Sequence, residues 1–130
     1  MKYLLFIIFI VLFISCKKEN NSQFDCKKAQ ELAQIDYENG KFIYYEYQNL
    51  NEDTTANSEF RNLLKEKNIL VKFKPERFSS CIPNDQFGIE YAKECYQTKM
   101  NYQLFAKFGH PFFDSLKIEA KRIHQTKIAK

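Results

Sequence analysis

The alternation of hydrophobic and polar residues predicts four helices and at least two strands behind an apolar N-terminal run. Apolar residues recur at helical spacing over residues 24–38, which predicts the first helix. Ser22-x-x-Asp25 resembles a capping box at its start, and Gly40 follows its end, where glycine is typical.

Two further helices are predicted near the C-terminus. Apolar side chains over residues 85–108 cover more than half of the helix circumference, which is typical of a helix at the centre of a core. Gly109 ends this helix, and Pro111 stands where the first turn of the next helix favours proline. The residues expected to face inward on that last helix are Phe112, Phe113, Leu116, Ala120 and Ile123.

Two segments rich in aromatic and β-branched residues predict strands. Residues 41–47 follow directly on the glycine turn, and residues 69–74 end at Pro75. Between them, Asn57 is expected to cap a helix that ends near Asn68. The order strand, helix, strand favours a right-handed crossover and a parallel pair.

These elements predict an α/β fold, with α+β as the alternative. The sheet has two or three strands, because a further strand over residues 78–82 is left open. It contains a parallel βαβ pair and is packed by about four helices, of which the last two form a helical hairpin. We expect a single globular domain over residues 24–130, since 130 residues leave room for one domain.

The N-terminal run predicts export. Residues 3–14 are continuously apolar behind a basic Lys2, but they are too few to span a bilayer, which takes about 20 residues. Residues 1–15 are therefore expected to be a secretory signal peptide that is removed. Residues 16–23 are polar and are expected to form a tether.

The end of this run, Phe13-Ile14-Ser15-Cys16, resembles the lipobox of bacterial lipoproteins. The resemblance implies that Cys16 is acylated and becomes the N-terminus, which attaches the domain to a membrane. The following residues, beginning with Lys17, are similar to the starts of lipoproteins from Bacteroidota. They imply anchoring in the cell envelope, with the outer membrane favoured and its face left open.

The C-terminal stretch gives a second, weaker resemblance. Glu94-Cys95-Tyr96, Lys107-Phe108-Gly109 and Phe112 to Leu116 are similar to the ends of small lipoproteins and exported proteins of Bacteroidota. That group has no activity to transfer. The resemblance therefore supports one coherent domain and contributes no catalytic residue.

The charge balance does not favour nucleic-acid binding. The chain has 20 Lys and Arg against 16 Asp and Glu, and removal of residues 1–15 takes away only Lys2, which leaves a net charge of about +3. Nucleic-acid binders usually carry a concentrated basic stripe. The basic residues near the C-terminus are expected to form a solvated helix face, with binding of an acidic ligand or lipid headgroup as the alternative.

Three cysteines remain after Cys16, namely Cys26, Cys81 and Cys95. Outside the cytoplasm two of them are expected to pair, and Cys81 with Cys95 is the favoured pair because the intervening segment is short. Three buried reduced thiols are the alternative.

No familiar catalytic or metal site is predicted. The three glycines are scattered, whereas phosphate-binding loops need several close together. His110 is expected at a helix corner and His124 on the surface, so neither is assigned as a catalytic base. His110 and Asp114 are four residues apart, but a zinc site needs three or four ligands, and Cys95 is the nearest further donor. We expect no cofactor.

The first strand has the most unusual composition, because both of its faces carry aromatic residues. Tyr44, Tyr45 and Tyr47 are expected in the core of a sheet covered by helices. The alternative is a tyrosine-lined recognition surface.

Together these features favour a non-enzymatic, lipid-anchored binding module with a protein partner. The alternatives are an immunity or inhibitor protein that neutralises a secreted toxin or hydrolase, and, less favoured, an enzyme.

Overall fold

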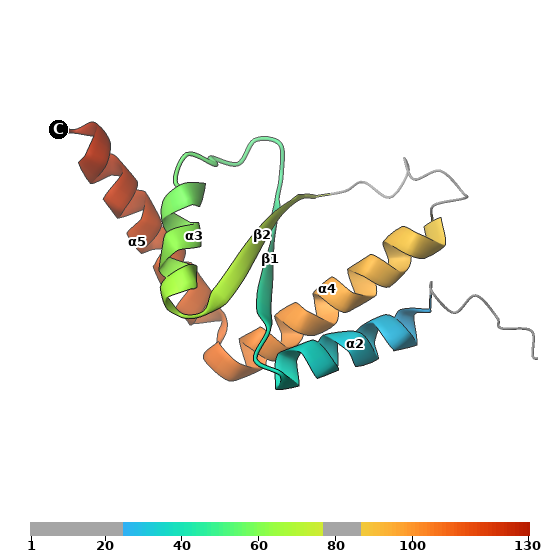
Figure 1. Ribbon diagram of the computed structural model, residues 1–130. Helices are drawn as coiled ribbons and strands as arrows, with labels where there is room; N and C mark the ends of the chain where they lie inside the picture. Colours follow the sequence, from blue (N-terminus) through green and yellow to red (C-terminus); the bar gives the residue numbers. More distant parts are fainter. Residues whose placement is uncertain (1–24, 77–86) are drawn as a thin grey trace, which may run out of the picture.

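The computed structural model describes residues 25–76 and 87–130 (Figure 1). In these residues the chain forms four helices and two strands. In order they are α2 (Cys26–Glu38), β1 (Phe42–Gln48), α3 (Asn57–Glu66), β2 (Ile69–Pro75), α4 (Phe87–Phe108) and α5 (His110–Ile128).

The two strands form a parallel pair with α3 as the crossover, as predicted. Phe42 lies opposite Ile69, and the register continues to Gln48 opposite Pro75. The fold is therefore a small α/β fold. The third strand considered for residues 78–82 lies outside the described residues.

Helices cover both faces of the sheet because its central residues are apolar on both sides. Tyr44 stacks on Phe113 of α5, with ring centroids 4.3 Å apart. Its neighbour Tyr45 points to the opposite face, where its ring meets Tyr96 of α4 edge-on at 6.3 Å. Figure 1 shows α3 and α5 on one side of the strands and α2 with α4 on the other.

The last two helices are adjacent and meet at a sharp corner. Gly109 has a φ of 81° and a ψ of 155°, a combination that residues with a Cβ avoid, and Pro111 lies in the first turn of α5. From this corner the helices diverge (Figure 1). As a result α4 packs mainly along α2, and α5 mainly along α3.

A side chain forms hydrogen bonds with the main chain at the outer edge of β1. The Asn101 amide of α4 accepts a hydrogen bond from the Tyr45 N–H at 2.8 Å and donates one to the Tyr45 carbonyl at 2.7 Å. Both residues are buried, so unpaired groups there would be costly. Asn101 thus makes at this position the hydrogen bonds that a neighbouring strand would otherwise make.

Two of the predicted helix starts are wrong in detail. Asp25 is itself the N-cap of α2, because its carboxylate accepts the Lys27 N–H at 2.9 Å, and Ser22 lies outside the described residues. Asn57 is the first residue of α3 rather than its cap. Its amide instead exchanges two hydrogen bonds with Gln48 at the end of β1.

Candidate functional site

A large groove lies between α2, α4 and β2 in the part of the chain that the structure describes. It has a volume of about 710 Å³. We call it the lysine groove, and it is lined by Asp25, Lys28, Ala29 and Leu32 of α2, by Tyr45, Lys72 and Lys74 of the strands, and by Ile89, Ala92, Lys93, Tyr96 and Gln97 of α4.

The groove exists because the layer of α2 and α4 covers β1 more fully than β2. Residues of β2 alternate between the two faces, and on the face toward α2 and α4 both Leu70 and Lys72 are exposed. In the groove itself, Leu32 is 53% exposed and Ile89 is 36% exposed. An open aliphatic surface beside four lysines is thereby presented to solvent.

The floor of the lysine groove is aromatic and held in place by hydrogen bonds. The Tyr96 hydroxyl donates to Asp36 at 2.5 Å, and Lys41 pairs with the same carboxylate oxygen at 2.9 Å. The hydrogen bond from Tyr96, followed by that from Lys41, lowers the pKa of Asp36. Burial raises the pKa values of Tyr96 and of its neighbour Tyr45, so both phenols stay protonated at neutral pH.

A disulfide between Cys26 and Cys95 joins the two helices that form the walls of the groove. Their Cα atoms are 5.4 Å apart, although the residues are separated by 69 positions. The predicted pairing of Cys81 with Cys95 is therefore wrong, because α2 packs along α4 and brings the start of α2 to the third turn of α4. Cys81 lies outside the described residues.

A second hollow adjoins the lysine groove and carries the opposite charge. We call it the acidic hollow. Its volume is about 440 Å³, and it is lined by Tyr47, Lys74, Pro75, Glu76, Glu90, Glu94, Gln97 and Thr98. Lys74 and Gln97 line both hollows. At this junction the Tyr47 hydroxyl donates to the Gln97 side-chain oxygen at 2.7 Å, which fixes the amide.

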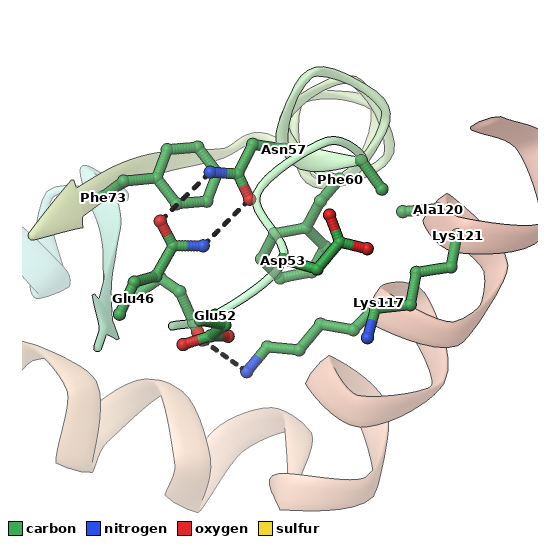
Figure 2. Close-up of a pocket in the computed structure, with 11 residues that line it drawn as sticks. Glu46, Glu52, Asp53, Asn57, Phe60, Phe73, Lys117, Ala120 and Lys121 are labelled. Atoms are coloured by element: carbon green, nitrogen blue, oxygen red, sulfur yellow. Dashed lines mark hydrogen bonds and ion pairs between the residues drawn. The ribbon is translucent and has the colours of Figure 1, made fainter. Parts of the chain in front are cut away.

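A third pocket, on the opposite face of the sheet, is a packing feature. It has a volume of only about 50 Å³, which is room for one or two water molecules. Figure 2 shows Lys117 of α5 reaching across it toward the acidic side chains. The Lys117 ammonium pairs with the buried Glu46 carboxylate at 2.6 Å. This ion pair joins α5 to β1.

A similar ion pair joins α5 to α3. Glu59 is buried, and its carboxylate lies 2.9 Å from the Lys127 ammonium and 3.5 Å from Nδ1 of His124. Hydrogen bonds from Ser58 and Lys127 are the main causes that lower the pKa of Glu59 to about 2. The predicted solvated face of α5 is thus only partly correct, and His124 is half-buried rather than a plain surface residue.

The tyrosines of β1 do not form one recognition surface. Tyr44 is 5% exposed and Tyr45 is 6% exposed, so the interpretation as core is correct for both. Tyr44 faces α3 and α5, whereas Tyr45 and the 42% exposed Tyr47 line the two joined hollows. Sequence reasoning missed the groove lysines because they come from three separate elements.

His110, at the corner between α4 and α5, belongs to no cluster of metal-binding groups among the described residues. His110 is exposed and stacks on Phe105, with ring centroids 3.9 Å apart. Across residues 25–76 and 87–130 there is no group of three His, Cys, Asp or Glu side chains placed to bind a metal. Cys95 is committed to its disulfide.

Comparison with known proteins adds no assignment, since no protein family, curated sequence or solved structure matches the chain. Of the helices described, none has both the length and the hydropathy to cross a membrane.

Proposed function

We propose that the protein is a lipid-anchored, non-enzymatic binding module of the cell envelope, with the lysine groove as its binding site. One observation carries the proposal. The groove combines about 710 Å³ of concave space with exposed aliphatic side chains, an aromatic floor and four lysines. Concave, largely apolar sites with a few polar groups are where proteins usually bind ligands.

The walls of the groove are fixed before any ligand arrives. The disulfide between Cys26 and Cys95 ties α2 to α4, and Tyr96 of α4 donates a hydrogen bond to Asp36 of α2. Gln103 of α4 adds a further hydrogen bond to Gln34 of α2 at 2.6 Å. A preorganised site loses less entropy on binding, which favours affinity.

The anchor places this groove near a membrane. Asp25, which lines the groove, lies only nine positions after Cys16, and an extended chain of that length reaches about 30 Å. A disulfide is typical of proteins in oxidising compartments, which supports export. The outer membrane is the membrane that we propose.

Replacement of Cys16 tests the anchor. We expect Cys16→Ser to lose the lipid, seen as the missing mass of the acyl chains, and to leave the detergent-phase fraction of the envelope. Cys81→Ser is the matched control and should keep both properties. An unchanged lipid mass in Cys16→Ser would refute the anchor.

Capture with the full-length, detergent-solubilised protein tests the binding site. Partners from envelope and spent medium of the source bacterium are identified by mass spectrometry for three proteins. These are the natural protein, the groove variant Lys72→Glu/Lys74→Glu, and a control variant, Lys65→Glu/Lys67→Glu. Lys65 and Lys67 are exposed at the end of α3, on the other side of the sheet.

We expect a stoichiometric partner that is lost with the groove variant and kept with the control. A partner kept by both variants would refute the groove as the binding site. The identity of the partner also separates two classes of protein. A resident envelope protein would identify an accessory subunit, and a secreted toxin or hydrolase would identify an inhibitor.

A further inference from the structure

The lysine groove and the acidic hollow form one elongated site with opposite charges at its two ends. They share Lys74 and Gln97 as lining residues, so the two hollows adjoin. Two adjoining hollows of about 710 and 440 Å³ favour an extended ligand that occupies both over a compact one.

The charges differ clearly between the two ends. The lysine groove has four lysines and one carboxylate, that of Asp25. The acidic hollow has Glu76, Glu90 and Glu94 against Lys74 alone. Lys93 and Glu90 pair with each other at 2.9 Å across one turn of α4, so part of the charge is balanced where the two ends meet.

Aromatic side chains line both hollows beside the charged groups. Tyr45 and Tyr96 form the floor of the lysine groove, and Tyr47 lines the acidic hollow. The Lys72 ammonium lies 5.9 Å from the centre of the Tyr45 ring, which keeps a cation beside the apolar floor. A ligand that uses both hollows would therefore combine an apolar group with groups of opposite charge.

We propose that the groove binds an extended peptide segment of a partner protein, with acidic residues at one end, an apolar residue in the middle and basic residues at the other end. This inference rests on the proposed binding function and names its partner chemistry. The acidic part would lie among Lys28, Lys72 and Lys74, and the basic part beside Glu76 and Glu94. Complementary charges of this kind set the direction of the peptide and speed its capture.

An anionic membrane surface fits this site less well. The surface would meet the three carboxylates of the acidic hollow as well as the lysines, and a flat headgroup layer does not enter a concave site. A small free anion would bind at the lysine end and leave the acidic end unused. The extended, bipolar peptide is the ligand that uses both ends.

Selection from a random peptide library tests the proposal. Peptides of about twelve residues are displayed on phage and selected against the full-length protein in detergent micelles, and the dissociation constants of enriched peptides are measured by fluorescence polarisation. We expect enriched peptides to carry an acidic and a basic part on either side of an apolar residue.

Charge reversal in the groove then tests where they bind. Lys72→Glu/Lys74→Glu should weaken binding about tenfold or more, and the control Lys65→Glu/Lys67→Glu should leave it unchanged. Reversal of the acidic residues in the peptide should restore binding to the groove variant. Glu76→Lys/Glu94→Lys should also weaken binding, and a peptide whose basic residues are replaced by acidic ones should restore binding to this variant.

Three results would overturn the proposal. The first is that the enriched peptides lack the bipolar pattern. The second is that neither Lys72→Glu/Lys74→Glu nor Glu76→Lys/Glu94→Lys changes their binding. The third is that no peptide is enriched while vesicles of phosphatidylglycerol bind the protein through Lys72 and Lys74. If an envelope partner is still captured through the groove, the binding function stands and only this peptide inference fails.

Discussion

Removal of the disulfide between Cys26 and Cys95 should destabilise the protein strongly. The bond joins residues 69 positions apart, so it closes residues 26–95 into one loop. The perturbation is the variant Cys26→Ser, which leaves Cys95 as a free, largely buried thiol. Because the bond ties α2 to α4, its loss should also loosen the walls of the lysine groove.

The size of the effect follows from the length of the loop. A crosslink between residues 69 positions apart removes about 15 cal/mol/K of entropy from the unfolded chain. At 25 °C this stabilises the folded state by about 4 kcal/mol. With a urea dependence of about 1.5 kcal/mol/M for a domain of this size, the unfolding midpoint should fall by about 3 M.

Urea unfolding followed by far-UV circular dichroism measures the effect, with and without a reducing agent. The natural protein should shift when it is reduced, whereas Cys26→Ser should not. Cys81→Ser is the informative control, since it should unfold like the natural protein. The reasoning would be refuted if Cys81→Ser lost the stability and Cys26→Ser kept it, because Cys81 would then be the partner of Cys95.

Three further predictions concern the hydrogen bonds and ion pairs of the core. Asn101→Leu removes both hydrogen bonds to the Tyr45 main chain and should cost about 2 to 4 kcal/mol in urea unfolding, since the buried groups are left unpaired. Lys117→Met leaves the buried Glu46 carboxylate without its cation and should cost about 3 kcal/mol, read from thermal unfolding at pH 7. The pKa of Glu59 is lowered from 4.5 to about 2 on folding, so its stabilisation is complete above about pH 4.5 and is lost as the pH falls toward 2. Glu59→Gln should remove that part of the pH dependence of unfolding.

Exposed residues provide the controls for these variants. Asn62 is exposed on α3, and Asn62→Leu should unfold like the natural protein. Arg122 pairs with Glu119 at an exposed position of α5, and Arg122→Met should have no measurable effect. Equal effects of Asn101→Leu and Asn62→Leu would contradict the role of Asn101 as the cap of the β1 edge. If Glu59→Gln lost stability below pH 4.5 in the same way as the natural protein, the low pKa of Glu59 would be contradicted.

Local signals predicted the elements well because each depends on neighbouring residues. The second strand was predicted over residues 69–74 and occupies Ile69–Pro75, and the first helix was predicted to end at 38 and does so. The prediction that Asn57 caps a helix was wrong because Gln48, nine residues earlier, takes up its amide. A local signal does not reveal such a competitor.

Most of the candidate site could not be predicted from the sequence, because contacts between residues far apart in the chain create it. The groove appears only when α2 packs along α4, and the same packing brings Cys26 to Cys95. Spacing alone favoured the nearer Cys81. The tyrosines of the first strand were found by composition, but burial on two opposite faces of the sheet separates Tyr44 from the groove.

Photocrosslinking from two exposed aliphatic positions tests the central claim most directly. A benzophenone amino acid is placed at Leu32 in the lysine groove or at Ile118 on α5, in the full-length protein in living cells. Ile118 is the more exposed, at 71% against 53%. The account predicts one defined crosslinked partner from position 32 and none from position 118. A partner that is crosslinked from position 118 and not from position 32 would contradict it.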